Sequence, residues 1–363
     1  MSPLNQQKVT VTESPTPQAA DVLADRSASD PPDTAAIPPP GRPVRRAAAF
    51  VSEAMERSSL IAVWLAMLVI FTLLSPHLFL TGGTMQTIFG SQQAEVFVAL
   101  AALTAFSVGE FDLSVAATMG LSATAIPVLA TNDHVPVALA CLVALGMSVA
   151  VGAANAFIVV RLGIDSIIAT LGMATLVGGI SYGLCNSNAV SLTSPELEQW
   201  TSHSLLGLPA NFWYGLIAAA AFAYVQHATA LGRHMLFVAS NRSVAKLAGV
   251  RVDRIRTQAY LTSSLIAGIG GLLLVGTVGS FDPSSTPAYL LPALSAAFLG
   301  TAVIVPGRFN PFGTVIAIYF LSTGIVGLQL LGLAGWVSDV FYGATLIVAL
   351  VLVRHLRPMR RKP

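Results

Sequence analysis

Ten long apolar segments, separated by short polar breaks, constrain the fold of this chain more than any other feature. A helix needs about 20 residues to cross the ~30 Å hydrocarbon core of a bilayer, and the segments approach or exceed that length. We therefore expect an all-α, polytopic membrane protein with about ten transmembrane helices. The expected spans are roughly 58–75, 84–108, 113–131, 136–160, 165–184, 211–228, 257–279, 288–305, 309–331 and 336–353.

The composition excludes several other classes of protein. Only 10% of the 363 residues are charged and 54% are hydrophobic, whereas a soluble domain carries about 25% charged residues. The 17 acidic and 19 basic residues nearly cancel, so no overall field favours nucleic acid. Cys141 and Cys185 have no metal-ligand spacing, and neither a P-loop nor an H-E-x-x-H motif occurs. We expect no catalytic residue, no metal, no cofactor and no nucleic acid partner for this chain.

The two ends of the chain differ from its apolar middle. Nine of the 21 prolines lie between Pro3 and Pro43, among small and polar residues. Such a segment cannot bury enough apolar surface to offset its ordering entropy. We expect a disordered tail over residues 1–57, a membrane domain over residues 58–353 and a basic tail over residues 354–363.

The distribution of charge predicts the topology. If the N-terminus is cytosolic and the spans alternate, all 19 Lys and Arg fall on the cytosolic side, which is the positive-inside pattern. The turn near Glu110 is the acidic exception. Spans 2–5 and 7–10 then have opposite orientations, which suggests an inverted repeat of the kind found in many transporters. The outer segments hold only acidic charges: Asp133, Glu196, Glu198 and Asp282.

Polar residues at membrane depth need a reason, because each charge there costs about 2.5–3.5 kcal/mol. Gln92 and Glu95 share one face of the second span, and Gln93 lies between them in sequence. One interpretation is a polar lining of a substrate path. The other is a set of hydrogen bonds between packed helices. The residues alone favour neither.

The stretch V-G-E-F-D-L-S-V, residues 108–115, carries two carboxylates beside a turn. Glu110 and Asp112 are either a proton or cation site or a structural element. Asp112 and Ser114 are good helix starters, and a carboxylate favours the positive end of the third span. Gly109 permits the tight turn. We favour the structural interpretation.

Small residues recur within several spans and are expected to let helices approach closely. This is a packing device rather than a sign of function. The expected contact points include Gly152, Gly178, Gly179, Gly268, Gly270 and Gly271.

The polar segment 229–256 holds six of the basic residues. Within it, residues 240–250 are predicted to form a short helix that Asn241 or Ser240 caps and Gly249 closes. Val244 and Leu247 would give it a small apolar face. Such a helix either docks on a partner or rests on anionic lipid headgroups, and the residues alone favour the lipid.

Four stretches resemble, in the same order, motifs of the permeases of bacterial ABC importers for monosaccharides of the ribose and xylose type. The resemblance differs in detail, because Glu110 and Ala116 replace usual glycines and Pro306 and Phe309 alter a Gly-Gly-Arg-Gly turn. The stretches are G-E-F-D-L-S-V-A (109–116), T-L-G-M-A-T-L-V-G-G-I (170–180), L-G-R-H-M-L-F-V-A-S-N-R-S-V-A-K-L-A-G-V (231–250) and L-G-T-A-V-I-V-P-G-R-F-N-P-F-G-T (299–314).

The resemblance implies a ten-helix permease of the bacterial cytoplasmic membrane that works with a second copy or a paralogue. It implies a cytosolic ATPase subunit that binds ATP and Mg, and an extracytoplasmic sugar-binding protein. The short helix would then be a coupling helix that contacts the ATPase through Asn241, Arg242, Ala245, Lys246 and Gly249. A neutral sugar needs hydrogen-bonding groups along its path, for which the candidates are Gln92, Gln93, Glu95 and Asn155.

Three rival functions remain. A related ABC permease would carry branched-chain amino acids or nucleosides. An ion-coupled secondary transporter would use Glu95 or Glu110 as a proton site and would need no ATPase. A membrane scaffold or receptor would transport nothing.

Overall fold

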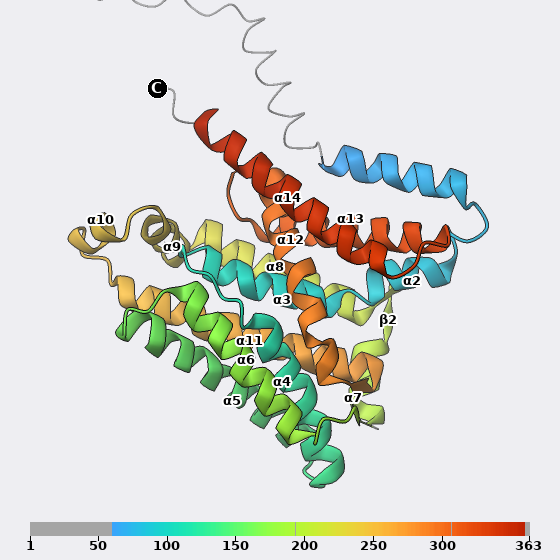
Figure 1. Cartoon of the computed structure of the whole chain (residues 1–363), viewed down its shortest axis with the longest axis horizontal. Helices are drawn as coiled ribbons and strands as arrows, with labels where there is room; N and C mark the ends of the chain where they lie inside the picture. Colours follow the sequence, from blue (N-terminus) through green and yellow to red (C-terminus); the bar gives the residue numbers. More distant parts are fainter. Residues whose placement is uncertain (1–59, 193, 306, 360–363) are drawn as a thin grey trace, which may run out of the picture. The chain divides into compact units, whose positions relative to one another are not determined.

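The computed structural model describes residues 60–192, 194–305 and 307–359, with side chains except those of Glu196 and residues 352–359. The predicted tail 1–57 and the last four residues lie outside this range. After the helix Leu60–Leu74, the helices are α2 (Gly82–Gly90), α3 (Gln93–Phe106), α4 (Val115–Pro127), α5 (Val137–Ala156), α6 (Ser166–Leu184), α7 (Pro195–Ser202), α8 (Ala210–Ala228), α9 (Ala230–Ser240), α10 (Arg242–Leu247), α11 (Val252–Val278), α12 (Leu290–Leu299), α13 (Pro311–Leu330) and α14 (Trp336–Met359) (Figure 1).

Short elements extend or join these helices. Two antiparallel ribbons pair β1 with β4 and β2 with β3. The short elements are η1 (Val128–Asn132), η2 (Phe157–Arg161), η3 (Pro283–Tyr289), η4 (Gly300–Ala302), β1 (Val190–Ser191), β2 (Ser204–Leu205), β3 (Leu208–Pro209) and β4 (Ser280–Phe281).

Six helices among the described residues are long and apolar enough to cross a membrane. The bent pair α8 and α9 makes a seventh when it is counted as one span. These lengths confirm the prediction of an all-α polytopic membrane protein. The six are Gly82–Phe106, Val115–Asn132, Val137–Arg161, Ser166–Leu184, Val252–Val278 and Pro311–Leu330.

The predicted span 288–305 is not one continuous helix. It is divided into η3, the ten-residue α12 and η4. Asp282 begins η3 by accepting the backbone N–H of Ser284 at 2.8 Å, and this bond lowers the pKa of the Asp282 carboxyl. Pro287 lies inside η3, and a proline in a helix interior removes a backbone donor, so it disfavours a continuous α-helix through that point.

The polar segment 229–256 is largely helical rather than a loop with one short helix. Thr229 ends α8 and caps α9 by accepting the N–H of Gly232 at 3.3 Å, and the chain bends by 76° there. α9 buries Met235 and Val238, while Arg233 and His234 face outward. The polar character of this segment predicted a loop, and the helical period of α9 was overlooked. α11 also begins at Val252, five residues before the predicted start.

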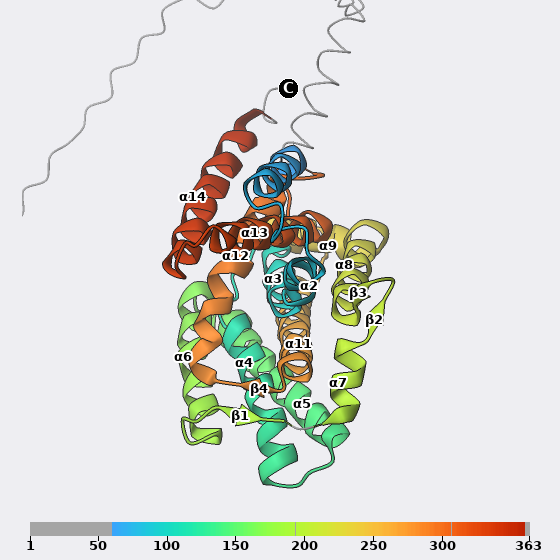
Figure 2. The ribbon, with the colours of Figure 1, turned by 90° about the vertical axis from the view of Figure 1, so that its right-hand side faces the viewer.

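α11 lies at the centre of the helix packing. It packs against α3, α4 and α5, which lie on different sides of it (Figures 1 and 2). Its 27 residues make a rod of ~40 Å, longer than the ~30 Å hydrocarbon core. α11 is therefore long enough to cross the hydrocarbon core with residues to spare or with a tilt.

Glycines on α11 permit this close packing. A methyl group added at Gly271 would meet the carbonyl oxygen of Met119 in α4, and one at Gly268 would meet Ser148 Oγ in α5 at 2.5 Å. Ser122 Oγ donates to the carbonyl of Gly268 at 2.9 Å across the same contact. The packing role predicted from the small residues is confirmed at these glycines. It is wrong at Gly178 and Gly179 of α6, where an added methyl group would meet nothing within 4 Å in the described structure. Of the other glycines predicted from the sequence, Gly152 and Gly270 also leave no room for a methyl group.

α5 and α6 lie at the periphery and present apolar side chains outward. Only 28% and 22% of their membrane-length windows are buried, against 78% for the span that contains α3. Leu142 of α5 and Ile168 of α6 are among the exposed side chains. Faces of this kind are stable in contact with hydrocarbon and would be a liability in water.

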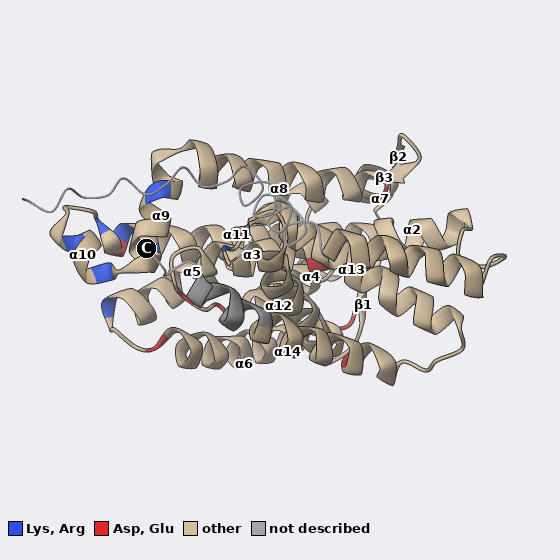
Figure 3. Ribbon diagram, turned by 90° about the horizontal axis from the view of Figure 1, so that it is seen from above, with Lys and Arg blue, Asp and Glu red and all other residues tan. Residues whose placement is uncertain are grey.

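The charged side chains are not spread evenly over the helices. Lys and Arg gather at the end that carries α9 and α10 (Figure 3). A one-sided distribution of this kind is the pattern that the positive-inside rule describes.

Replacement of Gly271 by alanine tests the packing at α11. We expect a loss of about 1–3 kcal/mol, because the backbone of α4 must move to admit the methyl group. Thermal unfolding of the purified protein in mild detergent measures the loss. Gly178→Ala is the matched control and should leave stability unchanged. Equal stability of the two variants would contradict this account of the packing.

Candidate functional site

The turn over residues 109–114, between α3 and α4, is held by side chains from four other helices. Gly109 has a φ of +76°, a backbone conformation that favours glycine and lets the chain turn directly after α3. Glu110, Asp112 and Ser114 follow it and are all buried. Buried polar groups need partners, so the contacts of this turn decide its role.

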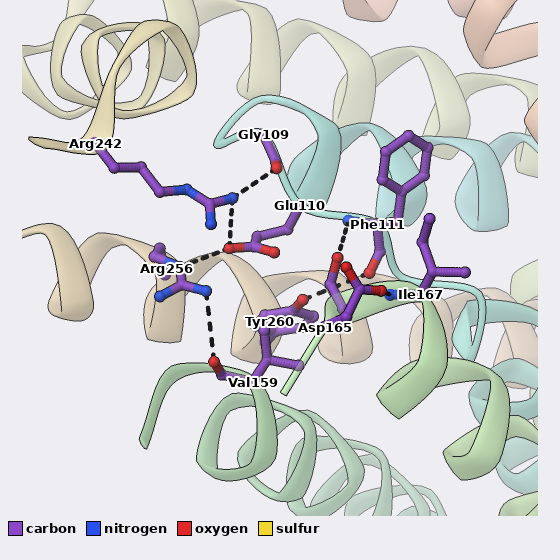
Figure 4. Close-up of polar contacts among 10 residues, drawn as sticks. Gly109, Glu110, Phe111, Val159, Asp165, Ile167, Arg242, Arg256 and Tyr260 are labelled. Atoms are coloured by element: carbon purple, nitrogen blue, oxygen red, sulfur yellow. Dashed lines mark hydrogen bonds and ion pairs between the residues drawn. The ribbon is translucent and has the colours of Figure 1, made fainter. Parts of the chain in front are cut away.

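Glu110 binds two arginines from different helices (Figure 4). Its Oε1 lies 2.8 Å from Arg242 Nη2 of α10 and 2.5 Å from Arg256 Nε of α11. Arg242 also donates to the carbonyl oxygen of Gly109 at 2.7 Å. One carboxylate thus joins α10, α11 and the 109–114 turn.

The same turn contacts α5, α6 and the next turn of α11. Arg256 Nη2 lies 3.5 Å from the carbonyl oxygen of Val159, at the end of α5 (Figure 4). The backbone N–H of Phe111 donates to Ser166 Oγ of α6 at 3.2 Å. Tyr260 Oη donates to the carbonyl of Phe111 at 3.4 Å.

Asp112 lies deeper and bonds to hydroxyl groups. It accepts the N–H and the Oγ–H of Ser114 at 3.0 and 2.6 Å, and the Oγ–H of Ser263 in α11 at 2.9 Å. Asn155 of α5 donates to Ser114 Oγ at 2.8 Å. Ser114 precedes α4 without a side-chain cap bond, and Asp112 accepts the N–H of Ser114 itself, so neither side chain caps an N–H within α4 as the sequence predicted. These contacts suit the structural interpretation of both carboxylates.

α10 is the short helix predicted within residues 240–250, and the structure confirms it over Arg242–Leu247. Asn241 Oδ1 accepts the N–H of Val244 at 3.1 Å and caps it, and Gly249 ends it with a φ of +81°. Ala245 is fully buried, so its side chain positions α10 and cannot touch a partner.

The outward face of α10 is apolar with a basic rim. Leu247 is 89% exposed and Val244 is 47% exposed. Lys246 and Arg242 are also exposed beside them. The exposed side chains of α10 therefore include Val244, Lys246 and Leu247, and the predicted contact residue Ala245 is not among them.

The candidates for a substrate path do not gather at one place. Gln93 Nε2 and Asn211 Nδ2 both donate to Thr277 Oγ1, at 3.2 and 2.6 Å, which joins α3, α8 and α11. Glu95 instead lies near the side chain of Tyr342 in α14.

The other two path candidates lie elsewhere. Gln92 is the residue at the break between α2 and α3. Asn155 belongs to the network around Asp112. The four candidates that the sequence grouped together thus lie in four different environments.

A cavity of about 450 Å³ opens beside Glu110 and reaches the start of α13. Its walls include four phenylalanines with ring centroids 5.0–5.5 Å apart, and its rim carries Arg233 and Arg308. The four are Phe106, Phe111, Phe298 and Phe309. Nothing in the sequence pattern indicated this cavity, because its residues come from four separate segments.

Sequence reasoning also missed the role of Arg256, which it used only to set the topology. A signal was available. Arg256, Tyr260 and Ser263 have spacings of four and three, so they share one face of α11. All three contact the 109–114 turn or its ion pair.

Among the residues that the structure describes, no three His, Cys, Asp or Glu side chains come together as a metal site. Glu110 and Asp112 lie close in sequence but bind different partners.

Comparison with known proteins gives a consistent result. The chain is 26% identical to the L-arabinose ABC transporter permease protein AraH of Azospirillum brasilense, over 87% of this chain and 93% of that protein. It is 28% identical to the ribose import permease protein RbsC of Escherichia coli (strain K12), over 82% and 93%. It is 28% identical to the autoinducer 2 import system permease protein LsrC of Salmonella typhi, over 85% and 88%.

No solved structure matches the chain. Residues 85–350, which run from α2 to α14, match the family described as the branched-chain amino acid transport system permease component. The match covers well over half of the chain and includes the 109–114 turn, α10 and α11. The chain therefore belongs to this family of transport permeases, and it is a multi-pass protein of the cytoplasmic membrane.

Proposed function

We propose that this chain is the membrane-spanning permease of an ABC importer for a monosaccharide of the ribose, xylose or arabinose type. The observation that carries the proposal is the similarity, over more than four-fifths of the chain, to permeases named for arabinose and ribose import. The energy would come from a separate ATPase subunit that binds ATP and Mg. This chain would carry no catalytic residue.

The proposal includes a finer topology than the helix lengths give. Ten spans would arise if Leu60–Leu74, α12 with its flanking 3₁₀ turns, and α14 also cross the membrane, in addition to the seven described above. Both termini would then be cytosolic, together with the basic end that carries α10. α2–α6 and α11–α14 would be oppositely oriented repeats.

The exposed face of α10 supports an ATPase partner over a lipid surface. A helix on a membrane surface buries its apolar face in the headgroup region. Here Leu247 and Val244 project from the end of the helices, on a segment held only through its buried side. An apolar tip with a basic rim suits a protein groove.

Three further partners complete the proposed importer. An extracytoplasmic sugar-binding protein would deliver substrate to the opposite end, and specificity would lie mostly in that protein. A second permease copy or a paralogue would complete the channel, and lipid would cover the remaining apolar faces. ATP binding would move the coupling helices and switch the pair between outward-open and inward-open states.

A permease for branched-chain amino acids is the second candidate, because the family description names that substrate. Uptake separates the two. Membrane vesicles that contain the complete importer should accumulate labelled pentose and should not accumulate leucine. Accumulation of leucine alone would overturn the sugar assignment.

Replacement of Leu247 by aspartate tests the docking role of α10. We expect co-purification of the ATPase to fall by at least about tenfold, roughly 1.4 kcal/mol, because a carboxylate replaces the apolar tip. The protein should still insert, since this side chain contacts almost nothing within the chain. Leu206→Asp is the matched control, because Leu206 is 84% exposed in the segment between β2 and β3. Equal binding by both variants would contradict the docking role.

Glu95→Gln tests the rival ion-coupled transporter. If ATP drives the chain, uptake into proteoliposomes should require ATP and persist when a protonophore removes the proton gradient. The Gln variant should keep this behaviour, because its amide can also hydrogen-bond to the neighbouring Tyr342. Uptake that follows the proton gradient and is lost in Glu95→Gln would favour the rival.

A further inference from the structure

We propose that Glu110 is a clamp that makes α10 and the first turns of α11 move together, so that displacement of α10 reaches the packed core through α11. This inference rests on the proposed function, in which ATP binding to the partner displaces α10. It gives the carboxylate of Glu110 a positioning role. The role differs from docking of the ATPase on α10, because the Glu110 ion pairs would transmit the movement of α10 to α11.

α10 cannot pass on a displacement by itself. It has six residues, and an isolated helix shorter than about 12 residues is marginal in water. Gly249 and the residues around it separate α10 from α11, so the covalent link includes a glycine in the left-handed region. The intervening segment is tied to α10 by backbone bonds, such as that from the Val250 N–H to the Ala245 carbonyl oxygen at 3.0 Å, and side-chain contacts must tie α10 to α11 itself.

Glu110 supplies such a contact from a third segment. Its carboxylate is 3% exposed and lies between two guanidinium groups, one from α10 and one from α11. Separating α10 from α11 leaves one guanidinium group without the carboxylate, either that of Arg242, which is 43% exposed, or that of Arg256, which is 13% exposed and costs more to leave unpaired. Figure 4 shows that both arginines point at the same carboxylate.

From α11 the contacts continue into the core. Arg256 reaches the carbonyl of Val159 at the end of α5, and Ser263 bonds to Asp112 two turns further along α11. α11 itself packs on α3, α4 and α5 through the glycine face described above. A movement of α10 that pulls on Glu110 therefore acts on α11 and α5 together.

The other arginines near the start of α11 do not share this geometry. Arg251 and Arg254 are exposed and form no ion pair among the described residues. Arg254 lies two residues from Arg256, on the same turn of the same helix. Arg254→Gln is therefore a matched control for Arg256→Gln.

The test uses the complete importer in proteoliposomes. Sugar uptake and ATP hydrolysis are measured together for wild type, Glu110→Gln, Arg256→Gln and Arg254→Gln. We expect uptake per ATP hydrolysed to fall by at least about tenfold in the first two variants, while the ATPase still co-purifies with them. Arg254→Gln should match wild type. Glu110→Asp keeps the charge and should restore part of the coupling.

Two outcomes would overturn the clamp. One is an equal ratio of uptake to hydrolysis in Arg256→Gln and Arg254→Gln. The other is a Glu110→Gln variant that loses uptake and hydrolysis only in proportion to the amount of folded complex. Partial recovery of uptake per ATP hydrolysed in Glu110→Asp, compared with Glu110→Gln, would show that the charge matters and that the loss is not a general loss of stability.

Hydrogen exchange on the full-length permease tests the clamp without the ATPase. Glu110→Gln should speed exchange at the α10 amides and in the first turns of α11, and leave α13 unchanged. Unchanged exchange in α10 would overturn the clamp. The two proposals can also fail separately. If the wild-type permease binds no ATPase but Glu110→Gln still speeds exchange in α10 and the start of α11, the proposed function fails and the clamp stands as a structural contact.

Discussion

The close packing of α11 against three other helices is the constraint on which the other parts of the structure depend. Lipid tails are as apolar as leucine, so helices in a bilayer gain little by burying leucine against leucine. They associate where small residues let backbones approach and where polar groups bond across the contact. α11 has both, since Gly268 and Gly271 admit neighbouring helices and Ser122 bonds to the Gly268 carbonyl. The peripheral α5 and α6 faces can then remain apolar and exposed.

The same helix also carries the polar contacts of the 109–114 turn, near its start at Val252. Arg256, Tyr260 and Ser263 follow one another along one face of α11 and bond to Glu110, Phe111 and Asp112. The charged contact, made by Arg256, lies nearest the start of α11, and the contacts further along the helix are made by the hydroxyl groups of Tyr260 and Ser263. This order follows the cost of burial, because an ion pair tolerates the headgroup region better than the bilayer centre.

The sequence predicted the membrane class and most of the long helices, because an apolar run of about 20 residues matches the thickness of the hydrocarbon core. It also predicted α10, where Asn241 and Gly249 are local capping signals. It failed at α9, whose amphipathic period around Arg233 and His234 was overlooked, and at the divided span around α12. The ion pair of Glu110 with Arg256 joins residues 146 positions apart, and no local pattern reports such a contact.

The two groups of polar residues differ in how completely they are bonded, and the difference bears on which part can yield. Around Asp112 both carboxylate oxygens have partners, and Glu110 Oε1 binds two arginines, so these contacts hold the network together although Asn155 Oδ1 is buried there without a donor. The amide cluster is only half satisfied. Thr277 donates its hydrogen to the Leu273 carbonyl, so it can only accept, and each amide must turn its nitrogen toward it. The oxygens of Gln93 and Asn211 are left buried without a donor.

Leaving an acceptor unpaired costs about 1–3 kcal/mol, so this contact of α3, α8 and α11 is weaker than the one at the other end of α11. A displacement delivered through α11 would therefore separate the amide cluster before it disrupts the network around Glu110.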